Sequence, residues 1–154
     1  MRGLMAAIAA MTLAGATTAA AEDEWQLADM GGGAVIGVEV SSIAVDGQFR
    51  SAAVMFVFGQ PAPDGTAVTL AAVGFDCAAH TVAVLGEDHI GEDGALLSSR
   101  EDGADAPADP ILPGSLFHSA EDMVCRGQRN PAGSSGAAEF VRAARRLLLQ
   151  AGAR

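Results

Sequence analysis

Ser115, His118, Glu121 and Asp122 lie within eight residues of one another and carry the groups of a nucleophilic hydrolase. In such enzymes a histidine takes the proton of a serine hydroxyl, and a carboxylate orients the histidine. The spacing places all four residues on one predicted helix, and no G-x-S-x-G turn presents the serine to a substrate. A serine that precedes an apolar helical stretch is instead typical of an N-cap. We therefore predict a capping serine, a surface histidine, no catalytic residue and no enzymatic activity.

The acidic segment 87–94 could offer carboxylates to a calcium ion. It lacks the alternating oxygen ligands of an EF-hand, and Arg100 stands where that motif places its bidentate glutamate. We therefore predict a solvated hairpin tip. We interpret the neighbouring acids in the same way, namely Glu101, Asp102, Asp105 and Asp109. The glycines 31–33 match no phosphate-binding motif, so the sequence predicts neither a metal nor another cofactor.

Cys77 and Cys125 are the only thiols of the chain. In an oxidising compartment an even pair of cysteines most simply forms one disulfide. Closing a loop of about 49 residues would disfavour the unfolded chain by roughly 4 kcal/mol in the entropy model. The alternative is a zinc site, for which His80 lies near Cys77, but no further residue completes a tetrahedron. We predict the disulfide.

The first 21 residues have the pattern of a secretory signal peptide. Arg2 supplies the positive charge, residues 4–16 form a short apolar stretch, and Ala19-Ala20-Ala21 is a small-residue cleavage site. A membrane anchor is the alternative, but it needs about 20 apolar residues, and this stretch is shorter. No cysteine near the cleavage site could carry a lipid. We therefore predict cleavage after Ala21 and a periplasmic or secreted mature chain without a transmembrane segment.

Charge divides the chain into an acidic body and a basic C-terminal end. Residues 22–125 hold eighteen acidic side chains against Arg50 and Arg100, whereas residues 126–154 hold six arginines against Glu139. The acidic body argues against nucleic acid and anionic lipid as partners of the main domain. The arginines could contact that acidic body or an anionic envelope component, but a solvated helix face is the simpler interpretation.

Strands are expected to position these groups over most of the mature chain. Trp25 either fills the core or starts a strand, and the glycines 31–33 form a flexible joint. Asp46-Gly47 predicts a hairpin with a type I′ turn, whose two central residues both need a positive φ. The predicted strands are 34–40, 42–45, 48–58, 67–76, 81–85 and 95–99, with an acidic turn at 86–94 and an exposed loop at 100–110. The apolar end of 48–58 is typical of a central strand covered on both faces.

Two helices are expected after the strands. Ser115 caps the first, which ends at Cys125, and Ser134 or Ser135 caps a second whose apolar stripe opposes its arginines. Strands followed by helices predict an α+β fold, with a mostly antiparallel sheet of five to six strands backed by the C-terminal helices. We divide the chain into a signal peptide (1–21), one domain (22–127), and a linker with a C-terminal amphipathic helix (128–154).

The order of several short motifs resembles the surface-adhesin protein E family of Gram-negative bacteria over residues 25–127. These motifs are Trp25, Ser41-Ser42-Ile43, the Asp46-Gly47 hairpin, Phe75-Asp76-Cys77, the stretch from Ile111 to Ser115, and Val124-Cys125. The resemblance implies an antiparallel sheet backed by helix and tied by one disulfide, which would join Cys77 to Cys125. It also implies a binding role, since a member of that family is an adhesin for host matrix proteins.

We therefore expect an extracytoplasmic binding module whose partner is a protein or an envelope component, with no ligand-binding residue identifiable from the sequence. One alternative is a periplasmic enzyme or small-ligand carrier with an unrecognised pocket, to which His80, His89 and His118 would belong. We expect each of these histidines to be an ordinary surface side chain. Another alternative is an accessory protein of the envelope with a structural role.

Overall fold

The computed structural model describes residues 23–130 and 136–152. The predicted signal peptide, its cleavage site and the two serines expected to cap the second helix lie outside these residues. Within them the chain is α+β, with an antiparallel sheet, two helices near the C-terminus and one disulfide, as predicted. None of the helices in this part of the chain is long and apolar enough to cross a membrane.

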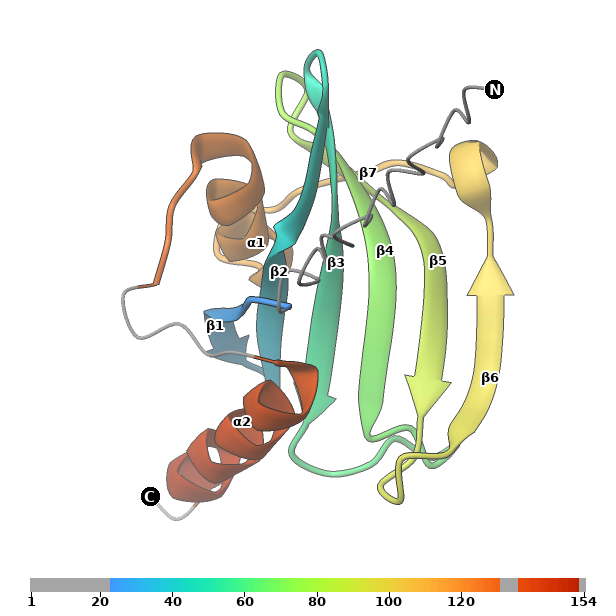
Figure 1. Ribbon diagram of the computed structural model, residues 1–154, viewed down its shortest axis with the longest axis vertical. Coiled ribbons are helices and arrows are strands. Elements are labelled where there is room, and N and C mark those ends of the chain that lie inside the picture. Colours follow the sequence, from blue (N-terminus) through green and yellow to red (C-terminus); the bar gives the residue numbers. More distant parts are fainter. Residues whose placement is uncertain (1–22, 131–135, 153–154) are drawn as a thin grey trace, which may run out of the picture.

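The sheet is a meander in which consecutive strands are neighbours, in the order β1-β2-β3-β4-β5-β6 (Figure 1). The six strands are β1 (Trp25–Gly31), β2 (Ala34–Asp46), β3 (Phe49–Phe58), β4 (Val68–Asp76), β5 (Thr81–Ile90) and β6 (Leu96–Glu101). A seventh, two-residue strand, β7 (Asp109–Pro110), pairs with the start of β5 after a short 3-10 turn, η1 (Gly103–Asp105). The sheet therefore has seven strands against the five to six predicted, and β7 lies in the segment 100–110 that the sequence predicted as an exposed loop.

The two N-terminal hairpins differ from the prediction in detail. The glycines 31–33 are not a joint but the turn between β1 and β2, and Trp25 both starts β1 and is buried. Asp46 pairs with Phe49, so the residues of the second turn are Gly47 and Gln48, and only Gly47 has a positive φ, of 61°. The predicted type I′ turn at Asp46-Gly47 is therefore wrong in position and in type, because Asp46 still belongs to the ladder and Gln48 does not have a positive φ.

The sequence predicts a break within β2 and an early end of β5, but both strands are continuous. The segments 34–40 and 42–45 are one strand with an irregularity between Glu39 and Ala44, where the Ser42 hydroxyl accepts a hydrogen bond from the Ala53 amide at 2.8 Å. Residues 86–90 are not an acidic turn but the second half of β5, paired with both β4 and β6. Acidic side chains are compatible with a strand at this point because the stretch is only half-buried.

The two helices cover opposite faces of the sheet, since successive strand residues point to opposite sides. α1 (Leu116–Arg126) packs against one face, and α2 (Ala137–Gly152) packs against the other. The buried residues on the α1 side include Ile36, Val54, Val73, Phe75, Ala120, Met123 and Val124. Those on the α2 side include Trp25, Val35, Met55, Val57, Phe140 and Ala144. β3 is therefore covered on both sides, as its apolar sequence predicted.

α2 reaches the sheet through a close fit between one aromatic ring and one glycine. A Cβ atom at Gly37 of β2 would lie 2.2 Å from Cζ of Phe140, so only glycine leaves room for the ring. The ring centroid of Phe140 lies 6.0 Å from that of Trp25. The contacts of α2 are with β1, β2 and β3, and Figure 1 shows the helix over that side of the sheet. On this face no described helix covers β4, β5 or β6.

Candidate functional site

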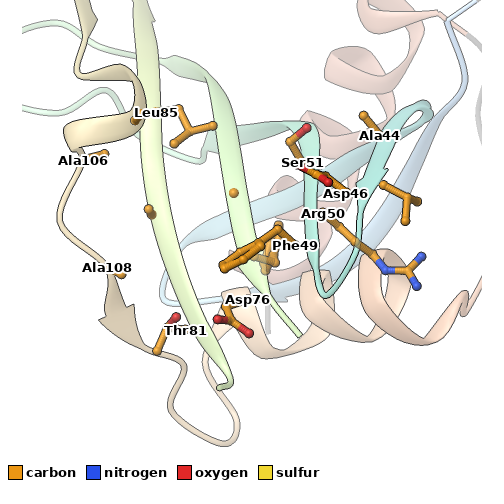
Figure 2. A pocket seen from close by; sticks show the side chains of 15 residues that line it. Ala44, Asp46, Phe49, Arg50, Ser51, Asp76, Thr81, Leu85, Ala106 and Ala108 are labelled. Carbon is orange, nitrogen blue, oxygen red and sulfur yellow. The ribbon is translucent and has the colours of Figure 1, made fainter. Parts of the chain in front are cut away.

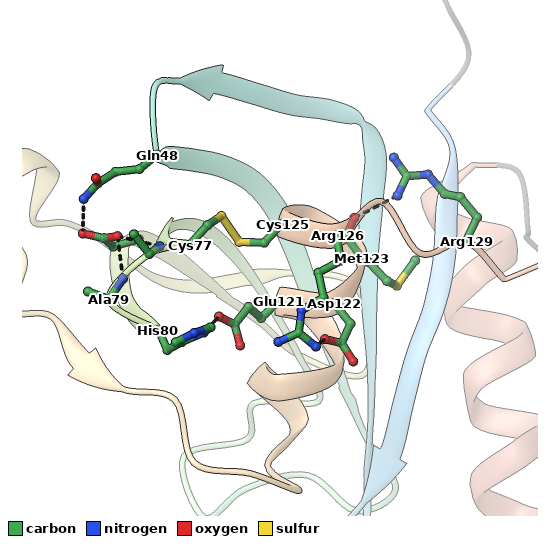
Figure 3. Close-up of a disulfide and its surroundings, with 12 residues drawn as sticks. Gln48, Cys77, Ala79, His80, Glu121, Asp122, Met123, Cys125, Arg126 and Arg129 are labelled. Atoms are coloured by element: carbon green, nitrogen blue, oxygen red, sulfur yellow. Dashed lines mark hydrogen bonds and ion pairs between the residues drawn. A yellow bond between two sulfur atoms is a disulfide. The ribbon is translucent and has the colours of Figure 1, made fainter.

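The predicted disulfide is present and joins the sheet to α1. Cys77 follows the end of β4, Cys125 lies in the last turn of α1, and their Cα atoms are 5.6 Å apart. Beside it, the buried Glu121 carboxylate bonds Nδ1 of His80 at 2.7 Å (Figure 3). The side chain of Glu121 is 3% exposed, whereas that of His80 is 59% exposed. The turn between β4 and β5 is therefore attached to α1 at two points.

The serine and histidine that could have formed a hydrolase site are not arranged as one. The Ser115 hydroxyl accepts a hydrogen bond from the His118 backbone amide at 3.3 Å, so it caps α1 as predicted. The His118 ring lies at the Gly114 amide, with Nδ1 3.5 Å from that nitrogen. Glu121 bonds His80 instead of His118. The structure thus gives Ser115 a backbone partner and does not bring a base to its oxygen.

His80 and His89 lie at opposite ends of one strand. His80 immediately precedes β5 and His89 lies near the other end of that strand, which at about 3.3 Å per residue separates them by roughly 30 Å. Nε2 of His89 lies 3.2 Å from Glu87, which also pairs with Arg100. His118 is on α1. No joint site of these three residues exists in the structure.

The acidic residues between 87 and 109 are distributed rather than gathered. Glu87 and Asp102 both contact Arg100, and Asp88 accepts a hydrogen bond from the Ser99 hydroxyl. Across residues 23–130 and 136–152, no group of three or more histidine, cysteine or acidic side chains could hold a metal ion. These carboxylates pair with side chains of neighbouring strand residues instead of converging on one point.

A groove opens on the uncovered part of the sheet face that also carries α2. Its floor is formed by β3, β4 and β5, and its two walls are the β2–β3 hairpin tip and residues 104–108. We call it the tip groove; its volume is about 510 Å³, and it opens to solvent rather than closing into a cavity. Figure 2 shows Leu85 and Ala106 on one side of the groove, Ala44 on the other, and the Phe49 ring between them.

The tip groove is hollow because the side chains on its floor are short. Ser51, Gly74 and Ala83 are cross-strand neighbours in one row, and Leu85 packs 3.6 Å from the position of a Cβ at Gly74. A second hollow of about 560 Å³ shares Ser51 and Leu85 with the tip groove and continues it down the sheet. The open half of this face is therefore one extended, shallow surface.

The rim of the tip groove carries carboxylates. Oδ1 of Asp76 accepts hydrogen bonds from the backbone amides of Ala79 at 2.9 Å and Ala78 at 3.0 Å, and Oδ2 accepts one from Gln48. These bonds, led by the one from Ala79, lower the pKa of Asp76 below its ordinary value. Asp46 lies at the end of β2, with β3 between it and Asp76, and its side chain is exposed. Arg50 also lines the groove, so the two carboxylates of the rim outnumber one cationic side chain there.

The arginines of α2 face solvent, as predicted. Arg142, Arg145 and Arg146 are exposed on the side of the helix away from Phe140 and Ala144. None of the three forms an ion pair with another described residue, in contrast to Arg100 and Arg126. The packing of α2 therefore depends on its apolar stripe and leaves its cationic side free.

No protein-family model matches the chain, and neither a curated protein nor a solved structure matches it. The candidate site is therefore defined by its own geometry. Sequence reasoning missed the tip groove, because a row such as Ser51, Gly74 and Ala83 comes from three strands. The available signals were local: an aromatic residue beside a hairpin turn, and small residues at alternate positions of β4.

Proposed function

We propose that the chain is an exported binding module and that the tip groove is its ligand site. The observation that carries the proposal is the groove itself, an apolar, solvent-open surface on the part of the sheet face that α2 leaves uncovered. Mainly apolar clefts of roughly 300 to 1,000 Å³ that carry a few polar groups are typical ligand sites. The arrangement of Ser115 and the three histidines supports binding rather than catalysis.

The proposal follows the resemblance to the surface-adhesin E family. An antiparallel sheet, backing helix and a Cys77–Cys125 disulfide agree with the fold that this resemblance implies. The disulfide also supports an oxidising location outside the cytoplasm, since such bonds persist mainly there. We place the mature chain, beginning at Glu22, in the periplasm or outside the cell, with a protein or envelope component as its partner.

The test is a binding experiment with the mature chain, labelled and applied to immobilised matrix proteins and to the envelope fraction of the producing cell. We expect saturable binding to one of them. Gly74→Trp fills the groove floor, and Ser98→Trp adds the same bulk to exposed strand β6 outside the groove. Binding that is lost in the first variant and kept in the second supports the proposed site. Equal binding by both variants, or no saturable binding at all, would overturn the proposal.

A further inference from the structure

We infer that the tip groove recognises a peptide segment in which a basic side chain is followed by apolar ones. The inference rests on the proposed function and adds the chemistry of the ligand. It depends on three features: one cross-strand row at the rim, the small residues next to that row, and the charge of the body.

The rim row places an aromatic ring between two carboxylates. In the strand register Asp46 pairs with Phe49, and Phe49 pairs with Asp76, so the three are consecutive neighbours across β2, β3 and β4. Residues directly opposite on antiparallel strands point to the same face. Phe49 is 55% exposed, and Figure 2 shows its ring beside Asp76. The negative face of an aromatic ring and two carboxylates form a site for an ammonium or guanidinium group.

Asp76 is prepared for this role before any ligand arrives. Its two oxygens are held by the amides of Ala78 and Ala79 and by the Gln48 side chain, so the carboxylate has a fixed orientation. It is also charged over the whole neutral range. A cation that approaches Phe49 therefore meets an anion whose position costs no further ordering.

The next row accepts the apolar part of the ligand. Ala44, Ser51, Gly74 and Ala83 are neighbours across four strands, directly below the rim row, and Leu85 follows. These short side chains leave depth for a side chain of the ligand. The covered part of the same face shows how a small residue accepts a large side chain, because Gly37 of β2 makes room for the Phe140 ring of α2. α2 also carries arginines, so it combines apolar and basic side chains as the proposed ligand does.

The charge of the body selects the sign of the partner. Residues 22–125 carry eighteen acidic side chains and two arginines. Arg100 is paired with Glu87 and Asp102, and Arg50 lines the groove, where Asp46 and Asp76 outnumber it. A basic segment is therefore attracted to the body as a whole before it contacts the groove. An acidic segment is repelled by the same field. This complementarity favours a basic peptide over a neutral or acidic one.

The probe is a fluorescent ten-residue peptide of arginine, leucine and alanine, titrated with the mature chain and compared with peptides carrying glutamine or glutamate in place of arginine. We expect saturable binding of the arginine peptide alone, weakened by added salt. Phe49→Ala and Asp46→Asn should each weaken it roughly two- to fivefold. Glu92→Gln removes one charge from the exposed β5–β6 turn and should leave the affinity within the error.

Two results would overturn the inference: equal binding of the glutamine peptide, or arginine-peptide binding that Phe49→Ala and Asp46→Asn leave unchanged. Sedimentation of the chain alone tests whether the groove binds a second copy of the chain. A dimer that Phe49→Ala dissociates would mean that it does, and would overturn the inference of a peptide ligand. Failure of the proposed function would give a different result from failure of this inference. In that case the arginine peptide binds at the groove, but Gly74→Trp does not change binding to matrix proteins or to the envelope fraction.

Discussion

α2 covers one end of one sheet face, over β1, β2 and the Met55–Val57 end of β3, and we call this end the covered half. No described helix covers the other end of that face, at the β2–β3 hairpin tip, and we call it the open half. The covered half presents Val35, Met55 and Val57, and these side chains are almost completely buried. The open half presents Ser51, Gly74 and Ala83, and the ring of Phe49 is 55% exposed at the rim. Both halves belong to one continuous hydrogen-bonded ladder, so the backbone does not distinguish them.

The difference between the two halves is therefore one of side-chain size. Large apolar residues on a sheet face require a cover, because leaving them exposed costs about 1.5 to 3 kcal/mol each. Small residues remove most of that requirement and leave a surface that water can reach without a large penalty. Small side chains thus let part of a sheet face stay uncovered at little cost in stability.

Removing the cover should have the largest effect. Phe140→Ala deletes the ring that fills the space at Gly37, and Phe-to-Ala changes in cores cost about 3 to 5 kcal/mol. We expect a loss of about 4 kcal/mol in the free energy of unfolding, measured by urea denaturation followed by circular dichroism. Phe49→Ala is the matched change on the open half and should stay within about 0.5 kcal/mol. Equal losses would mean that Phe49 also stabilises the fold.

The opposite face tests whether covalent attachment matters as much as packing. Replacing both cysteines, Cys77→Ser with Cys125→Ser, should lower the free energy of unfolding by about 3 kcal/mol, since the bond closes a long loop. Urea denaturation of the double variant checks this value, with the wild-type chain under reducing conditions as its control. A loss below about 1 kcal/mol would show that packing and the Glu121–His80 contact hold α1 without the bond.

Adding one methyl group to a glycine of each half tests the difference between them most directly. Gly37→Ala drives a Cβ to 2.2 Å from the Phe140 ring, so we expect a loss of about 2 kcal/mol from overpacking. Gly74→Ala places its Cβ 3.6 Å from Leu85, an ordinary contact, and should be tolerated within about 0.5 kcal/mol. Thermal unfolding of both variants measures the difference. Reversed losses would contradict the assignment of covered and open halves.

The smallest expected effect concerns the buried carboxylate on the α1 side. Glu121→Gln keeps the shape but weakens the bond to His80, and we expect a loss of about 1 kcal/mol. Asp122→Asn on the same helix breaks an exposed pair with Arg126 and should cost about 0.3 kcal/mol. Chemical denaturation of the two variants, measured side by side, separates the buried contact from the exposed one.

The elements were largely predictable because their signals are local. The apolar run of β3, the capping Ser115 and the stripe of α2 each depend on residues close in sequence, and each element is present. The disulfide followed from having only two cysteines. The errors lie where the decision depends on a neighbouring strand, such as 86–90, whose acidic composition is typical of a turn but whose partners on β4 and β6 keep it in the sheet.

The candidate site could not be predicted for the same reason. Asp46, Phe49 and Asp76 form a row only after two register relations are fixed, and a slip of one residue would turn Phe49 to the other face. Glu121 likewise has its partner His80 forty-one positions away. Contacts of this kind carry no short-range pattern, so they enter only with the structure.

The meander order of the sheet has a consequence for how the chain reaches this structure. Every strand from β1 to β6 pairs with its neighbour in sequence, so each hairpin requires only a short loop to close. Low separation of contacting residues favours fast folding. A chain that emerges N-terminus first can therefore complete its sheet strand by strand. Cys125 lies 48 residues after Cys77 and after all the strands in the sequence, so the disulfide can form only once every strand of the sheet has emerged.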